Sequence, residues 1–133
     1  MLSIFPSLFD YHMMGPFFLR CALAAVFIAH GYPKLFGKFA GTAQFFESIN
    51  IKPGKFWALF VGMIECGGGI LLILGLWVQP VALLLVIDMV VAILKVTRKK
   101  GFVGGYELDL TLLLIALSLI FLGPGAFSID LPL

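Results

Sequence analysis

The sequence is poor in charge. Lys, Arg, Asp and Glu make up 12% of the 133 residues, whereas 62% are hydrophobic and the mean hydropathy is +1.13. Soluble domains carry about 25% charged and about 45–50% apolar residues, so a soluble fold of this size would lack the polar surface to cover itself. The scarcity of charge therefore excludes an ordinary soluble domain. It predicts an integral membrane protein with a single domain, residues 1–133.

Cysteine is also scarce, and its placement excludes several chemistries. Cys21 and Cys66 form no CxxC motif and no Cys/His cluster, so we expect no metal site and no thiol redox centre. Both lie in apolar runs and are interpreted as small buried hydrophobes. The basic residues occupy short connections rather than one helix face, which argues against nucleic-acid binding. The first fifteen residues lack the basic start of a signal peptide, so no cleavage is expected.

Long apolar runs are what the sequence has in abundance. Four can be recognised, each of 17–22 residues, at 16–36, 56–77, 80–97 and 106–122. At 1.5 Å per residue a helix of this length crosses a hydrocarbon core of about 30 Å. Helix is favoured over strand because lipid offers no partner to free backbone groups. The predicted fold class is an all-α membrane protein, a bundle of four transmembrane helices.

The first connection, 37–55, is longer than a simple turn. Thr42 is placed to cap a short helix whose apolar residues share one face: Phe45, Phe46 and Ile49. We therefore predict a short amphipathic helix that lies on the membrane surface in this connection.

The basic residues predict the topology. With four spans, eight of the nine basic residues fall on the side of connections 37–55 and 98–105, and only Arg20 falls on the side of the termini. By the positive-inside rule both connections face the cytoplasm and both termini face outward. The predicted location is the cell (inner) membrane, with several passes.

Ionisable residues inside the spans are the candidate functional residues. A charge at the centre of a membrane helix costs roughly 2.5–3.5 kcal/mol on insertion scales, so such residues call for partners or for a function. The candidate polar cluster consists of Arg20, His30, Lys34, Glu65, Asp88, Glu107 and Asp109.

Depth along each helix suggests which of these residues meet. Arg20, His30 and Lys34 share one face of the first span, within about 80° of arc. Counting helical rise places His30 near the depth of Glu65, and Lys34 near that of Glu107. We therefore predict the contacts His30–Glu65 and Lys34–Glu107. Alternatives stay open: residues near the interface can snorkel to it, and His30 with Glu65 could be a structural core pair or a proton-handling pair.

The second span carries a smooth face of small residues. Gly62, Glu65, Cys66 and Gly69 follow helical spacing, and small residues allow close approach of helices in lipid. The predicted packing residues are Gly62, Gly68 and Gly69. At the C-terminal end, Ser128 and Asp130 are interpreted as caps of a turn after the last span.

Four motifs in order resemble the DoxX family of small four-helix membrane proteins. They are Phe27–Phe36 with its His-Gly-Tyr-Pro-Lys core, Glu65–Gly69 followed by Leu74–Leu76, Gly105–Glu107, and Gly123–Gly125 with Ser128–Asp130. The likeness spans roughly residues 17–130. By position, the residues similar to the family's polar pattern are His30, Lys34, Glu65, Glu107 and Asp130.

The resemblance implies a subunit or accessory of a quinone-linked or oxidative-stress system. A quinone is then a possible ligand at a His30/Glu65/Lys34 pocket, and other membrane subunits or self-association are possible partners, besides the lipid bilayer. No haem-ligand pair or nucleotide motif is visible, so the chain is not expected to be catalytic alone. The alternatives are a scaffold or chaperone-like membrane protein, and a small-solute or proton transporter.

Overall fold

The computed structural model describes residues 3–130, and all regular elements in that range are helical. The α-helices are α1 (Met14–Phe36), α2 (Phe39–Ser48), α3 (Gly54–Leu74), α4 (Val78–Ala92) and α5 (Glu107–Leu122). Short helices of other types fill the remaining stretches: η1 (Pro6–Tyr11), η2 (Ile93–Thr97), η3 (Arg98–Lys100) and η4 (Phe102–Tyr106). The predicted all-α fold class is confirmed.

Four helices of the described chain are long and apolar enough to cross a membrane. They cover Met14–Phe36, Gly54–Leu74, Val78–Lys100 and Phe102–Leu122, so the four predicted spans are confirmed, with small shifts at their ends. The second span ends before Trp77 because Gly75 takes the left-handed conformation that closes α3. The third begins two residues before Pro80, which therefore lies inside the first turn.

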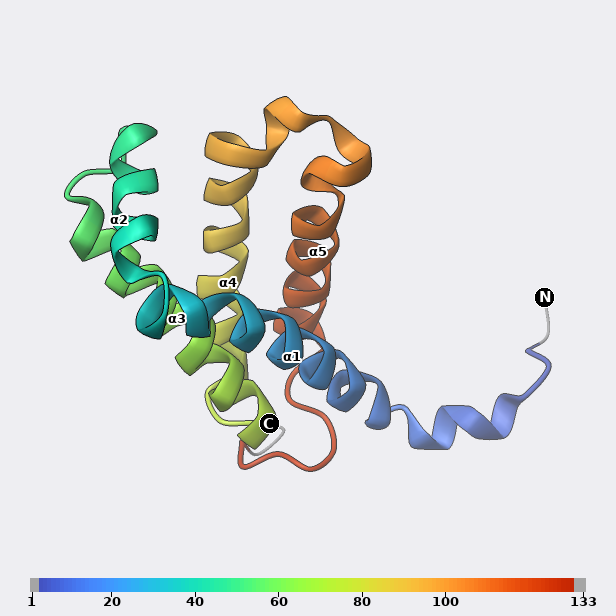
Figure 1. Cartoon of the computed structure of the whole chain (residues 1–133). Helices are drawn as coiled ribbons and strands as arrows, with labels where there is room; N and C mark the ends of the chain where they lie inside the picture. The colour runs from blue at the N-terminus through green and yellow to red at the C-terminus, as the bar shows by residue number, and fades with distance from the viewer. Residues whose placement is uncertain (1–2, 131–133) are drawn as a thin grey trace.

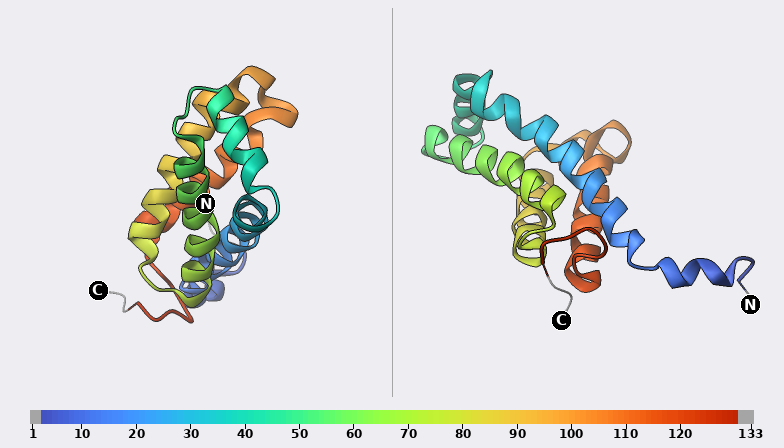
Figure 2. Two further views of the ribbon diagram at one scale, coloured as in Figure 1. Left: turned by 60° about the vertical axis from the view of Figure 1, so that its left-hand side comes forward. Right: turned by 90° about the horizontal axis from the view of Figure 1, so that it is seen from below.

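The helices are arranged as two inclined pairs. α1 packs chiefly against α3, and α4 packs chiefly against α5. The pairs separate towards the end of the bundle that carries α2 on one side and residues 98–105 on the other (Figures 1 and 2). The shared core lies in the opposite half and includes Leu23, Phe27, Leu72, Leu85 and Leu119. Because the apolar residues extend around each helix, many remain on the outside, where lipid can cover them.

Glycine residues, which have no side chain, explain how closely α1 and α3 approach. A Cβ atom at Gly31 would lie 2.6 Å from the backbone nitrogen of Cys66, and one at Gly69 would lie 2.6 Å from Ile28 Cγ1. Gly62 similarly leaves room for Leu35, and Gly68 for Val81 of α4. The glycines of α3 therefore admit one neighbouring helix on each of two sides, the arrangement that small residues favour in lipid.

The predicted amphipathic helix in the first connection is present as α2 and packs against α3. The capping role predicted for Thr42 is wrong. Thr42 lies inside the helix, where its hydroxyl donates a hydrogen bond of 2.8 Å to the Lys38 carbonyl. Since the helix starts at Phe39, the hydroxyl lies about one turn beyond the position from which a side chain can accept hydrogen bonds from the free N–H groups of the first turn.

The wide end of the bundle is the basic end. Connection 37–55 and residues 95–100 both lie there, and together with Lys34 they carry eight basic residues. We call it the basic end; the opposite, closed end carries Arg20 and residues 123–130.

Candidate functional site

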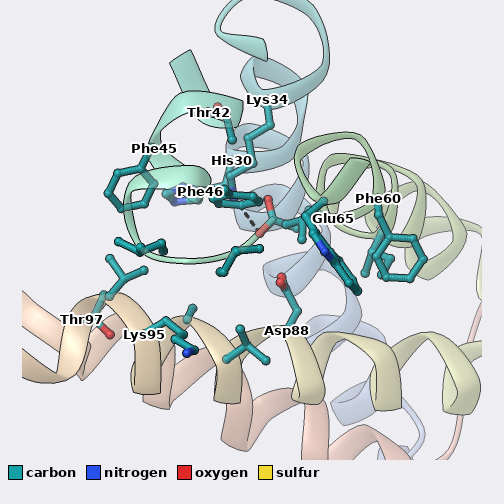
Figure 3. A pocket seen from close by; sticks show the side chains of 18 of the residues that line it. His30, Lys34, Thr42, Phe45, Phe46, Phe60, Glu65, Asp88, Lys95 and Thr97 are labelled. Carbon is teal, nitrogen blue, oxygen red and sulfur yellow. Dashed lines mark hydrogen bonds and ion pairs between the residues drawn. The ribbon is translucent and has the colours of Figure 1, made fainter. Parts of the chain in front are cut away.

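A large cleft opens between α1, α2 and α3 on one side and α4 on the other (Figure 3). Its volume is about 820 Å³, within the range of roughly 300–1,000 Å³ typical of small-molecule sites. The cleft exists because the two helix pairs diverge towards the basic end while α2 covers one flank. It is the candidate functional site.

The walls of the cleft are mostly apolar and come from three helices. α2 contributes the aromatic face predicted from the sequence, together with Ile49. α4 contributes a stripe spaced three and four residues apart, which places it on one helix face. The main apolar lining residues are Phe45, Phe46, Ile49, Trp57, Phe60, Ile64, Leu84, Ile87 and Val91.

An ion pair forms the floor of the cleft. Lys34 Nζ lies 2.6 Å from Glu65 Oε2 and 2.8 Å from Oε1, and it donates a hydrogen bond to each oxygen. The Glu65 side chain is 4% exposed and that of Lys34 is 27% exposed. The close approach of α1 and α3 at Gly31 brings the two helices within reach of this pair.

Both contacts predicted from depth are therefore wrong. Glu65 binds Lys34 rather than His30, and Glu107 instead accepts a hydrogen bond of 3.0 Å from the Gly104 backbone N–H. The error comes from comparing Cα positions. Side chains lean towards the N-terminus of their helix, and α1 and α3 run antiparallel, so the long side chains of Lys34 and Glu65 lean towards each other. For the same reason Lys34 points into the bundle instead of snorkelling outward.

His30 and Asp88 complete the polar part of the cleft. His30 lines the cleft and is exposed. Among the described residues, no hydrogen bond joins it to Glu65. Asp88 points from α4 towards Glu65 (Figure 3). Its Oδ2 atom is buried and has no hydrogen-bond partner among the described residues. The floor thus combines one ammonium group, two carboxyl groups and an imidazole.

Some lining residues were missed by the sequence reasoning. Lys38, Lys95 and Thr97 border the cleft towards the basic end. The spacing of seven residues between Asp88 and Lys95 puts both on one face of the third span, but only Asp88 was included in the candidate cluster. Lys38 could not be found in this way, since its place depends on how α2 folds back over α3.

Arg20 does not belong to this site, although the sequence grouped it with the polar cluster. It is fully buried at the closed end. Its guanidinium donates hydrogen bonds to four backbone carbonyls: Leu72 and Ile73 at the end of α3, and Ala126 and Phe127 in the C-terminal segment. Arg20 therefore ties residues 123–130 to the bundle.

Asp130 has a longer-range role than the local cap predicted for it. Its carboxylate accepts hydrogen bonds from the backbone N–H groups of Trp77, at 2.8 Å, and Val78, at 2.7 Å. It thereby caps the N-terminus of α4, where a carboxylate also suits the helix dipole. The signal for such a partner was the sequence Leu76-Trp77-Val78, which starts a helix without any local capping residue.

Asp109, at the start of α5, lies beside the end of the third span. Its Oδ2 atom accepts a hydrogen bond of 2.9 Å from the Thr97 hydroxyl. Of the seven candidate residues, the structure thus gathers His30, Lys34, Glu65 and Asp88 at the cleft. It places Asp109 next to them, and it sets Glu107 and Arg20 apart.

Comparison with known proteins gives a consistent result. The family model described as DoxX matches residues 15–98. A Bacillus subtilis protein named "Putative oxidoreductase CatD" is 34% identical over 117 residues, which cover 88% of this chain and 85% of that protein. Inner membrane protein YphA of Escherichia coli is 27% identical over 145 residues, covering 92% and 94% of the two chains. No solved structure gives a significant match.

Proposed function

We propose that this chain, which belongs to the DoxX family, is a membrane redox subunit that binds a quinone-type molecule in its cleft. The observation that carries the proposal is the combination of a large apolar cleft and a deep polar floor. A quinone has the matching structure, an apolar ring and tail with two carbonyl oxygens that need hydrogen-bond donors.

The floor of the cleft has hydrogen-bond donors that are not used within the protein. A lysine ammonium has three N–H donors, and the Glu65 oxygens use two of them at Lys34. The third donor and a ring nitrogen of His30 can each serve one carbonyl oxygen. The carboxyl groups of Glu65 and Asp88 lie where protons are needed when a quinone is reduced to a quinol.

The name of the Bacillus subtilis relative, "Putative oxidoreductase CatD", is in keeping with a redox role. The present sequence has no haem-ligand pair, nucleotide motif or CxxC. We therefore assign it the part of a subunit or accessory, with electrons exchanged through a partner protein in the same membrane.

Quinone binding can be measured with the two tryptophans, because one lies at the cleft and the other lies at the closed end. Trp57 lines the cleft, and Trp77 lies beyond the far end of α3, at the start of α4. With Trp77→Phe protein in nanodiscs, a short-chain ubiquinone is expected to quench Trp57 fluorescence with saturation. His30→Ala should weaken this binding roughly fivefold, because a hydrogen bond of about 1 kcal/mol is lost.

Trp57→Phe protein, which keeps only Trp77, is the matched control. Its fluorescence should fall only weakly and without saturation as quinone partitions into the lipid. Equal, unsaturable quenching of both tryptophans would contradict binding in the cleft.

We also propose that the basic end faces the cytoplasm, on the distribution of basic residues. Phe102 then lies inside and Phe127 outside, and both side chains are exposed on the protein surface. Chymotrypsin added to sealed right-side-out vesicles should cleave after Phe127 and leave Phe102 intact. The opposite pattern of fragments would reverse the orientation.

A further inference from the structure

A second, smaller cavity lies behind the ion pair. Its volume is about 100 Å³, and its lining residues are Phe27, His30, Lys34, Glu65, Met89, Ala92, Leu108, Asp109 and Leu112. His30, Lys34 and Glu65 line the large cleft as well. The Lys34–Glu65 pair is therefore part of the wall between the two spaces, with the cleft on one side and Asp109 beyond the other.

The small cavity suits water. A buried water molecule needs a cavity of at least roughly 10–15 Å³ and two to four polar partners. This cavity is several times that size, and four ionisable side chains border it: His30, Lys34, Glu65 and Asp109. Engineered cavities that stay dry are lined by apolar groups alone.

Asp109 links the cavity to the basic end of the bundle. It lies in the first turn of α5 and is half-buried. The hydroxyl of Thr97, which borders the large cleft, holds it in place at 2.9 Å. Because Asp109 is only partly buried, part of the residue is open to the surface of the protein.

We propose that the small cavity is a water-filled proton path that connects Asp109, at the basic end, with the carboxyl groups of Glu65 and Asp88 at the floor of the cleft. Asp109 acts as the entry group, and water in the cavity carries protons between Asp109 and Glu65. The purpose of this path rests on the proposed function, because the path serves a ligand that gains or loses protons in the cleft.

The titratable and charged groups that face the path come from every helix around it. They are His30 and Lys34 of α1, Glu65 of α3, Asp88 of α4, Lys95 of η2 and Asp109 of α5. Lys34 holds Glu65 by both oxygens, so Asp88, with one oxygen free of partners, is the group best placed to pass a proton into the cleft.

The test follows proton arrival directly in ligand-free protein in nanodiscs. After a rapid drop in pH, infrared spectroscopy records the C=O stretch of newly protonated carboxyl groups. Glu65→Gln and Asp88→Asn variants identify the bands that belong to the floor. In Asp109→Asn, these bands should appear at least fivefold more slowly than in the wild type and reach the same final amplitude.

Two further variants decide what a slower rate means. Glu107→Gln removes a carboxylate from the same helical turn, outside the cavity, and keeps an oxygen for the Gly104 N–H; it should leave the rate unchanged. Leu112→Phe fills the cavity without altering any charge and should also slow the rate at least fivefold. It tests the path independently of Asp109→Asn, including the case in which that variant does not fold.

The proposal is overturned if the floor bands are absent, if neither Asp109→Asn nor Leu112→Phe slows them fivefold, or if Glu107→Gln slows them as much. Because no quinone is present, these outcomes are independent of ligand binding. Saturable quenching of Trp57 with unchanged infrared kinetics would refute the path alone, and slowed kinetics without quenching would refute quinone binding alone.

Discussion

Replacing Lys34 with methionine is expected to destabilise the protein by about 3 kcal/mol. The change leaves the Glu65 carboxylate, 4% exposed, without its cation. Breaking a buried ion pair by removing one partner costs about 3–5 kcal/mol, and the lower end applies because the Lys34 side chain is 27% exposed. Reversible unfolding in mixed detergent micelles, followed by helical circular dichroism, measures the loss.

A double variant tests whether the loss of stability comes from the unpaired Glu65 charge. Buried ion pairs can often be replaced by apolar residues of similar volume at little cost, so Lys34→Met/Glu65→Leu should lie within about 1 kcal/mol of the wild type. The resulting double-mutant cycle gives the coupling energy of the two side chains. If the double variant were as unstable as Lys34→Met, the pair would not be the source of the effect.

Lys38→Met is the matched control for this experiment. Lys38 lies four residues further along the chain, borders the same cleft and is exposed. Surface substitutions of this kind change stability by about 0.5 kcal/mol or less. The stable double variant also tests the role of the pair in function, because it should retain the fold and lose saturable quenching of Trp57 by quinone.

Replacing Arg20 with methionine is expected to destabilise the closed end by about 3–4 kcal/mol. Hydrogen bonds to charged groups contribute roughly 1.5–3 kcal/mol each, and four carbonyls lose their donor. Some of these carbonyls are only partly buried and regain a partner from water. The C-terminal segment should loosen, and chymotrypsin cleavage after Phe127 should accelerate at least tenfold in the same micelles.

Arg20→Lys should restore less than half of the stability lost in Arg20→Met. A lysine keeps the charge but lacks the planar fork with which arginine reaches carbonyls of two different segments. Cys21→Ala serves as control, because Cys21 is the next residue of α1 and its side chain is exposed, contrary to the burial expected from the sequence. A Lys variant as stable as the wild type would mean that charge alone, and not the fork, holds the segment.

The sequence alone was sufficient for the architecture. Runs of about twenty apolar residues must form helices in lipid, since no other conformation satisfies the backbone, and this argument needs no tertiary information. The same holds for α2, whose apolar residues follow helical spacing, and for the close packing at the glycines of α3. Four motifs in order were also enough to identify the DoxX family.

The pairing of charges was decided by the tertiary structure. Composition and spacing showed that Lys34 and Glu65 needed partners, but counting depth by Cα positions assigned them the wrong ones. Two long side chains on antiparallel helices can close a gap of more than one helical turn, and the choice depends on how closely Gly31 lets the helices approach. The partners of Arg20 and Asp130 were also decided by the tertiary structure. Arg20 donates to backbone carbonyls and Asp130 accepts from backbone N–H groups, and every sequence contains such groups.

The cleft itself also depends on tertiary structure. Hydrophobicity is nearly uniform around α4 and α5, so the sequence carries little information about the angle between the helix pairs. That angle follows from the sum of many small packing contacts, and it determines where the pairs separate and which side chains line the space between them. The residues of the site were therefore largely visible in the sequence, whereas the site as a space was formed only when the helices packed.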